Sequence, residues 1–158
     1  MPHKRGKLKQ DMGLHHDRQN PAAILIVEHD RGDMDRLMQA MEDAGYDFAA
    51  VGSVPAALAL CKEEVLDLVL VDISAPGMDG NGAVGRLHRS PLLASFPIVA
   101  ITAPITAEEA AALRKCGVTA MVTRPIDASR LRRTIETLLH KRVRGGSRSR
   151  AAYSSRSA

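Results

Sequence analysis

Polar side chains follow four apolar runs of this sequence, and their types suit the binding of one anion. In chain order these side chains are Glu28, His29 and Asp30, then Asp72, then Thr102, and then Arg124. An isolated aspartate in such a place usually forms a turn or caps a helix. A carboxylate, a hydroxyl group and a guanidinium that meet at one place can instead hold an anion between them. Whether they meet depends on the elements that precede them.

Between about residues 22 and 140 the sequence alternates short apolar runs with amphipathic segments. Four runs have the length of buried strands and span 23–27, 48–51, 68–71 and 97–101, and Met121 and Val122 belong to a fifth expected strand. Helix signals separate them, because Ser53, Thr106 and Asp127 can cap helix N-termini and Gly45 and Gly117 can end helices. Strands joined by single helices require a parallel sheet with helices on both faces. The carboxyl ends of such strands share one edge, so we expect the polar residues there.

The core of this fold must be aliphatic, because aromatic residues make up only 3% of the chain and tryptophan is absent. In the helix that Ser53 begins, Leu58, Cys61 and Val65 have the spacing of an inner face. Neither Cys61 nor Cys116 belongs to a Cys-x-x-Cys pair. The sequence therefore supports no zinc site and no disulfide framework, and we expect a cytoplasmic protein.

The charges divide the chain into three parts. Residues 1–20 carry five basic and two acidic residues, residues 141–158 carry six basic and no acidic residues, and the part between them is acidic overall. We expect a basic, flexible N-terminal extension (1–20), one domain (21–142) and a disordered Arg/Ser-rich tail (143–158). With Tyr153 as its single aromatic residue, the tail is expected to aid solubility rather than bind nucleic acid. No apolar run is long enough for membrane insertion.

Residues 67–80 resemble the phosphorylation-site motif of response-regulator receiver domains, in which Pro-Gly-Met-Asp-Gly follows a strand-ending aspartate. Here Asp72 ends the strand and the pentapeptide spans 76–80. The resemblance extends over residues 22–140 and includes Thr102 and Pro125 after the fourth and fifth strands. It implies an α/β fold of the chemotaxis-regulator type. That fold has a doubly wound, flavodoxin-like sheet of five parallel strands in the order 2-1-3-4-5, with helices on both faces.

The resemblance also implies a role for the polar residues at the expected sheet edge. Asp72 would attack a phosphohistidine of a histidine kinase or phosphotransfer protein and carry the phosphoryl group as an acyl phosphate. The Thr102 hydroxyl and the Arg124 guanidinium would contact the phosphoryl oxygens. Glu28, Asp72 and the backbone carbonyl of Ser74 would hold Mg²⁺, the one cofactor that we expect.

Three positions differ from the pattern of the family. His29 stands where the family usually has a second acid, which would weaken Mg²⁺ binding unless Asp30 compensates; alternatively, His29 is a partly exposed loop residue. Arg124 replaces a lysine, and its guanidinium could grip a phosphoryl group or form an ion pair with Asp72 that blocks attack. Met121 occupies the place of the switch aromatic, and a methionine lacks the two-position geometry of a ring.

Two functions remain open from the sequence. In the first, the protein is a single-domain response regulator that accepts a phosphoryl group on Asp72 and signals to a downstream protein through its fifth strand and last two helices. In the second, it is a degenerate receiver that binds proteins without phosphorylation. The Asp72 motif and Thr102 favour the first function.

An enzyme of doubly wound fold is not expected. No Gly-rich phosphate loop follows the first strand, and the chain has no Gly-x-Ser-x-Gly elbow. Slow loss of its own phosphoryl group would be the only turnover. We also expect no DNA-binding output domain, because few residues follow residue 140, so the output would be a protein contact.

Overall fold

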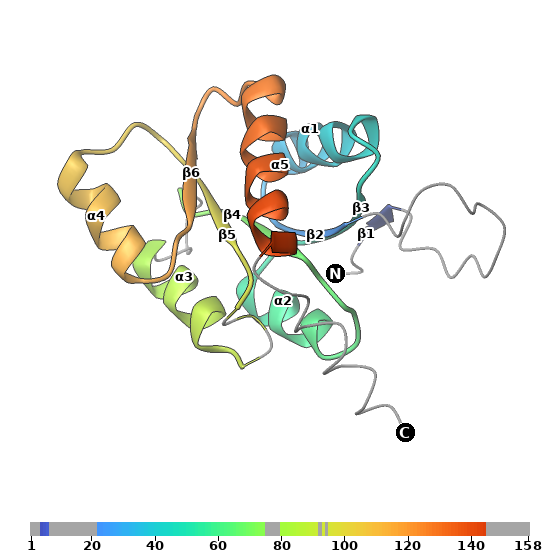
Figure 1. The fold of residues 1–158 in the computed structure, drawn as a ribbon, viewed down its shortest axis with the longest axis horizontal. Coiled ribbons are helices and arrows are strands. Elements are labelled where there is room, and N and C mark those ends of the chain that lie inside the picture. Colours follow the sequence, from blue (N-terminus) through green and yellow to red (C-terminus); the bar gives the residue numbers. More distant parts are fainter. Residues whose placement is uncertain (1–3, 7–21, 75–79, 92, 94, 145–158) are drawn as a thin grey trace, which may run out of the picture.

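The computed structural model describes residues 4–6, 22–74, 80–91, 93 and 95–144, with a six-stranded sheet at its centre (Figure 1). The strands are β1 (Lys4–Gly6), β2 (Ala23–Val27), β3 (Asp47–Val51), β4 (Leu68–Asp72), β5 (Ile98–Thr102) and β6 (Ala120–Thr123). Their order in the sheet is β1-β3-β2-β4-β5-β6. Strands β2 to β6 pair in parallel. Counted without β1, they have the order 2-1-3-4-5, which confirms the predicted fold class.

Strand β1 lies within the predicted N-terminal extension and was not expected from the sequence pattern. It pairs antiparallel with β3, with Lys4 opposite Ala50 and Gly6 opposite Phe48. Three residues of the extension thereby cover an edge of β3 that would otherwise offer unpaired backbone groups. The remainder of the extension, residues 75–79 of the Asp72 motif and the predicted tail from residue 145 onward lie outside the described residues.

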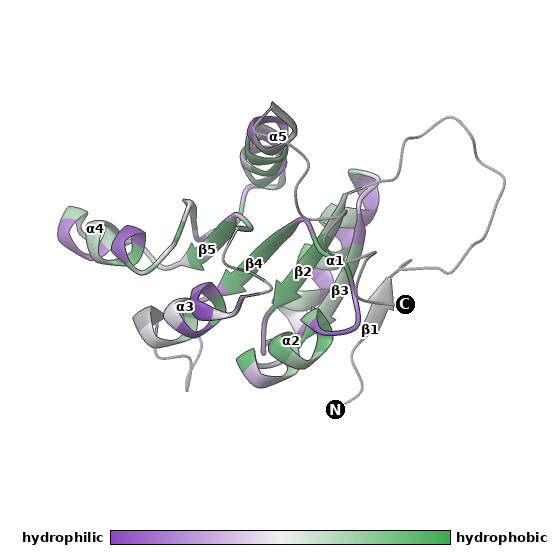
Figure 2. Ribbon diagram, turned by 60° about the horizontal axis from the view of Figure 1, so that its bottom comes forward, coloured by the Kyte–Doolittle hydropathy of each residue, from purple (hydrophilic) through white to green (hydrophobic). Residues whose placement is uncertain are grey.

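In the described residues, five helices cover the two faces of the sheet (Figure 2). They are α1 (Arg31–Asp43), α2 (Val54–Cys61), α3 (Gly80–Arg89), α4 (Ala107–Lys115) and α5 (Ala128–Arg144). Helices α1 and α5 lie on one face, and α2, α3 and α4 lie on the other. Helix α5 continues two residues past the expected domain boundary at 142. In the described part of the chain, no helix combines the length and the apolar character that a bilayer crossing needs.

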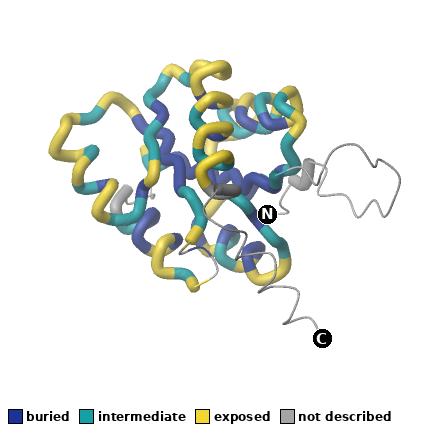
Figure 3. The backbone as a smooth tube through the Cα atoms, in the orientation of Figure 1, coloured by how far each residue is buried: buried dark blue, intermediate teal, exposed yellow. Residues whose placement is uncertain are grey.

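Each face of the sheet has its own apolar core, because successive side chains of a strand point to opposite faces. In β2, Leu25 and Val27 belong to the cluster that includes α2, α3 and α4, and Ile24 and Ile26 belong to the cluster with α1 and α5. All four are fully buried, and the strands form the dark-blue centre of Figure 3. Burial of each such side chain contributes about 1.5–3 kcal/mol. The central strands therefore have to be apolar on both faces.

Side-chain caps and glycines fix the ends of the helices. The Ser53 hydroxyl accepts a hydrogen bond from the N–H of Ala56 at 3.3 Å, and Thr106 and Glu109 form a reciprocal capping box at the start of α4. Gly45, after α1, has a φ of 77°, which only glycine adopts without strain. These caps confirm the predicted helix starts and the α1 stop, and they set where each strand enters the sheet.

Helix α2 is shorter than its apolar spacing suggested, and its predicted inner face was wrong in part. The helix ends at Cys61, so Val65 lies beyond it. Its buried face includes Ala57, Leu60 and Cys61, whereas Leu58 is only partly buried. An apolar residue at the next helical position does not show whether the helix extends that far, and here the chain turns away first.

Candidate functional site

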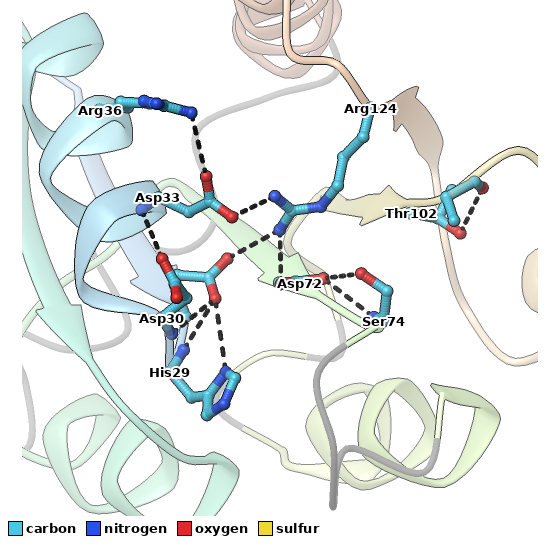
Figure 4. Close-up of polar contacts among 10 residues, drawn as sticks. His29, Asp30, Asp33, Arg36, Asp72, Ser74, Thr102 and Arg124 are labelled. Atoms are coloured by element: carbon cyan, nitrogen blue, oxygen red, sulfur yellow. Dashed lines mark hydrogen bonds and ion pairs between the residues drawn. The ribbon is translucent and has the colours of Figure 1, made fainter.

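Asp72 is the last residue of β4, and its carboxylate is buried at the carboxyl edge of the sheet (Figure 4). Its Oδ1 accepts hydrogen bonds from the backbone N–H of Ser74 at 2.9 Å and from the Ser74 hydroxyl at 2.7 Å. Its Oδ2 accepts a hydrogen bond from Nη2 of Arg124 at 2.6 Å. Both oxygens of the predicted acceptor are therefore held by donors in defined directions.

Glu28 follows β2 directly, and its side chain is fully buried beside Asp72. In the sheet, β3 lies beside β2 on one side and β4 lies beside it on the other. The strand order therefore reverses between β2 and β4, and these two carboxylates flank this switch point of the doubly wound sheet. Oε1 of Glu28 accepts the backbone N–H groups of His29 at 2.9 Å and Asp30 at 3.0 Å. Its Oε2 faces Nη2 of Arg124 at 3.2 Å.

The Arg124 guanidinium joins three carboxylates (Figure 4). Nη2 donates to Glu28 and Asp72, and Nη1 donates to Oδ2 of Asp33 in the first turn of α1. The backbone N–H of Arg124 donates to the carbonyl of Thr102 at 2.8 Å, which fixes the arginine beside the end of β5. Of the two roles left open for Arg124, the structure contains the ion pair with Asp72.

Asp33 is the member of this cluster that the sequence did not indicate. Its position three residues into a helix has the appearance of an ordinary acid in a first turn, which the helix dipole stabilises. Asp30, considered above as a substitute metal ligand, instead caps α1 and accepts the N–H of Asp33 at 2.9 Å. The Asp30 side chain therefore serves the helix start.

His29 lies at the rim of the site. Its side chain is 49% exposed, and Nδ1 is 3.8 Å from Oε1 of Glu28. This position matches the alternative in which His29 is a partly exposed loop residue. It leaves Glu28 as the buried acid contributed by the end of β2.

Thr102 and Met121 occupy the neighbouring strand ends. The Thr102 side chain is buried, and its hydroxyl donates to the carbonyl of Ala103 at 2.9 Å. Met121 pairs with Ala100 in the sheet register and is partly buried against the core that contains α2, α3 and α4. The sheet thus brings Thr102 to the same edge as Asp72, with its hydroxyl in a local hydrogen bond.

The electrostatics of the cluster follow from burying two carboxylates next to one cation. Burial, together with a hydrogen bond to Asp72, raises the pKa of Glu28 to about 7. Burial acts to raise the pKa of Asp72 as well, but hydrogen bonds from Glu28 and Ser74 and the charge of Arg124 outweigh it and lower the pKa. Burial opposes the charge of Arg124, but the contact with Asp33 and the three nearby carboxylates raise its pKa.

The donor set suits a hard divalent ion such as Mg²⁺. One oxygen of Glu28 and one of Asp72 both lie within 3.2 Å of a single nitrogen, so they already face one cationic group. Among the described residues, no three His, Cys, Asp or Glu side chains gather as a metal site. An ion bound by Glu28 and Asp72 would take its other ligands from the Ser74 carbonyl and from water. Mg²⁺ commonly binds to one or two carboxylates in this way and keeps several water ligands.

A doubly wound sheet with a buried aspartate at its switch point, faced by an acid and a cation, is the architecture of a signalling receiver. Residues 24–136 match the response regulator receiver domain family. The chain therefore belongs to that family, and it contains a single receiver domain.

Known relatives agree with this assignment. The polar-differentiation response regulator DivK of Brucella anthropi is 29% identical over 119 residues, which cover 75% of this chain and 97% of DivK. The crystal structure of a CheY-like receiver domain protein from Methanospirillum hungatei has 25% identity and a TM-score of 0.72, over 80% of this chain and 99% of that one.

Magnesium is present in one solved structure of similar fold. The receiver domain of a sensor histidine kinase from Pseudomonas aeruginosa has a magnesium ion coordinated in its active site cleft. It has 20% identity and a TM-score of 0.67, and the match covers 76% of this chain and 98% of that one. Several other curated relatives are much longer proteins, of which this chain spans 12% to 27%.

Proposed function

We propose that Asp72 accepts a phosphoryl group from a phosphohistidine on a histidine kinase or phosphotransfer protein. The observation that carries this proposal is a buried carboxylate at the switch point whose pKa is lowered, so that it is ionised at neutral pH. A carboxylate oxygen attacks phosphorus, the P–N bond to the imidazole breaks, and the histidine leaves as the carboxylate becomes an acyl phosphate.

Residues around Asp72 have separate tasks in this reaction. The two donors of Ser74 orient the carboxylate through Oδ1. Arg124 lies against Oδ2 and, after transfer, its guanidinium can hold phosphoryl oxygens in a charged hydrogen bond. Thr102 would exchange its bond to the Ala103 carbonyl for a phosphoryl oxygen. That exchange gives the phosphorylated state a different conformation at the end of β5.

Glu28, Asp72 and the Ser74 carbonyl are the residues that would hold Mg²⁺. When bound, the ion supplies positive charge that offsets the negative charge of the carboxylates and the incoming phosphoryl group. His29 contributes no buried oxygen to this set, so we expect weaker Mg²⁺ binding than two adjacent acids would give.

Signal output would run through a protein partner. The fifth parallel strand, β6, carries Met121 in place of a switch aromatic, and α4 and α5 flank it. We infer that a downstream protein reads this surface, and that the protein works in the cytoplasm, where a kinase would meet it. The similarity to the receiver domain of a sensor histidine kinase supports a histidine-kinase partner.

The experiment that tests the proposal is phosphorylation by a small phosphodonor. The purified protein with millimolar Mg²⁺ and acetyl phosphate should gain one phosphoryl group by intact-mass spectrometry. Asp72→Asn, which keeps the shape of the side chain, should gain none. A wild-type protein without adduct would contradict the proposal and favour a receiver that binds proteins without phosphorylation. An equal adduct on Asp72→Asn would contradict it by showing that another residue carries the phosphoryl group.

A further inference from the structure

The Arg124 guanidinium occupies the space that a divalent ion would need. In both carboxylates one oxygen is held by backbone N–H groups: Oε1 of Glu28 by His29 and Asp30, and Oδ1 of Asp72 by Ser74. The other two oxygens are left for a cation.

Nη2 of Arg124 lies 3.2 Å from one of these oxygens, on Glu28, and 2.6 Å from the other, on Asp72. Magnesium bound to both oxygens would sit at about 2.0–2.1 Å from each. A guanidinium nitrogen and a magnesium ion cannot share that position.

Asp33 anchors the guanidinium from the opposite side. Nη1 donates to Asp33 in α1 while Nη2 donates to Glu28 after β2 and Asp72 at the end of β4, so the planar fork contacts three segments of the chain at once. A lysine ammonium, with one nitrogen, does not have this fork geometry. Both ends of the contact lie on ordered structure, because Asp33 is in the first turn of capped helix α1 and the backbone of Arg124 is bonded to β5.

Water and salt screen the contacts of this cluster less than they screen surface ion pairs. The Arg124 side chain is 25% exposed and that of Asp33 is 22% exposed, while Glu28 is fully buried. Exposed ion pairs contribute little because water and salt screen them. Here the contacts to Glu28 and Asp72 are largely out of water, so displacement of the guanidinium has a measurable cost.

We propose that Arg124, held by Asp33, is a resident cation that competes with the divalent ion for Glu28 and Asp72. The inference rests on the proposed function and deepens it, because it names the group that sets how much magnesium the site requires. In the resting protein the guanidinium neutralises Asp72. Magnesium displaces it, and the freed guanidinium is then available to phosphoryl oxygens.

Competition of this kind has a reciprocal signature. If Arg124 weakens Mg²⁺ binding, Mg²⁺ must weaken the contact of Arg124 with the carboxylates by the same factor. The side-chain ¹H–¹⁵N signals of Arg124, assigned by their loss in Arg124→Lys, report that contact without any phosphodonor. In EDTA they should be shifted and protected from exchange. With Mg²⁺ they should move toward the positions of free guanidinium at the same midpoint as the backbone amides of Glu28 and Asp72.

Charge-conserving variants separate competition from general electrostatics. Arg124→Lys keeps the positive charge but removes the fork, so Mg²⁺ should bind at least about fivefold more tightly by calorimetry. The matched control is Arg132→Lys, on the exposed side of α5, where the arginine contacts Glu136. That variant should leave the affinity unchanged. In EDTA, Asp33→Asn should remove the exchange protection of the Arg124 signals.

Several outcomes would overturn the inference. The first is a Mg²⁺ titration in which the amides of Glu28 and Asp72 shift while the Arg124 signals stay unchanged. The second is equal Mg²⁺ affinity of the wild type and Arg124→Lys, and the third is no binding by either protein at millimolar Mg²⁺. Displacement of Arg124 without a phosphoryl adduct on Asp72 would support the inference and contradict the proposed function. A phosphoryl adduct on Asp72 that forms while Arg124 stays in place would support the proposed function and contradict the inference.

Discussion

Replacing Glu28 with glutamine should change how the stability of the metal-free protein depends on pH. Glu28 is fully buried, and burial with the hydrogen bond to Asp72 raises its pKa from 4.5 to about 7. The folded state therefore holds a proton on Glu28 more tightly than the unfolded state does. Such a group favours folding at low pH, and this contribution is lost as the pH rises from about 4.5 to about 7.

The size of the effect follows from the two pKa values. The difference between 4.5 and about 7 corresponds to about 3 kcal/mol of unfolding free energy. The lowered pKa of Asp72 acts below its ordinary value of 3.8, which is outside this pH window. Glutamine stays neutral and can still accept hydrogen bonds from the N–H groups of His29 and Asp30. The unfolding free energy of Glu28→Gln should therefore not fall as the pH rises from about 4.5 to about 7.

Urea unfolding in EDTA at several pH values between 4.5 and 8 measures the effect. The free energy of unfolding of Glu28→Gln relative to wild type should rise with pH and level off above pH 7, by about 3 kcal/mol in all. The difference at pH 4.5 serves as the internal reference for any cost of the substitution itself. If the difference between the two proteins is the same at every pH, the pKa of Glu28 is not raised in the folded protein.

Three further predictions concern the fold. Ile26→Ala removes a fully buried side chain and should lower the unfolding free energy by about 2–5 kcal/mol in urea titrations; a loss below about 1 kcal/mol would contradict the core described for β2. Gly117 has a φ of +116°, and a Cβ there would lie 2.4 Å from Cγ of His88. Gly117→Ala should therefore destabilise by about 1–3 kcal/mol, with part of the loss recovered when combined with His88→Ala, and no recovery would show that the clash is unimportant. Cys61 is buried and its pKa is raised to about 11 by burial, so iodoacetamide at pH 8 should label Cys116 first and Cys61 mainly after unfolding, as peptide mass spectrometry would show; equal labelling of the native protein would be inconsistent with this packing.

The strands and the helices on both faces could be predicted because their signals are local, whereas the strand order came from the resemblance of residues 67–80 to the receiver motif. The run 23–27 is apolar at every position, as a strand buried on both faces requires, and glycines and caps mark the intervening helices. The end of α2 could not be predicted in the same way. Cys61 and Val65 have helical spacing, but spacing does not show where a helix stops.

Strand β1 could not be predicted for a different reason. Lys4–Gly6 has no apolar alternation, and its described pairing with β3 is through backbone register. Any short segment of suitable length can pair with an open strand edge, so side-chain patterns carry little information about such a strand.

At the site, the sequence placed Glu28, Asp72, Thr102 and Arg124 at one edge because each stands at the carboxyl end of a strand of the same parallel sheet, and the family resemblance added Ser74. The place of Asp33 depends on the rotation of α1 relative to a loop 91 residues away, and no local pattern encodes that. Asp30 did carry a readable signal, since an aspartate just before a helical stripe is a common N-cap. Its carboxylate indeed caps α1.

Chemical mapping can show whether Asp72 is the residue that carries the phosphoryl group. After reaction with acetyl phosphate and Mg²⁺, borohydride reduces an aspartyl phosphate to homoserine, which peptide mass spectrometry locates in the chain. Homoserine is expected at position 72 and at no other aspartate. An unreduced Asp72, or reduction at another carboxylate such as Asp30 or Asp33, would contradict it.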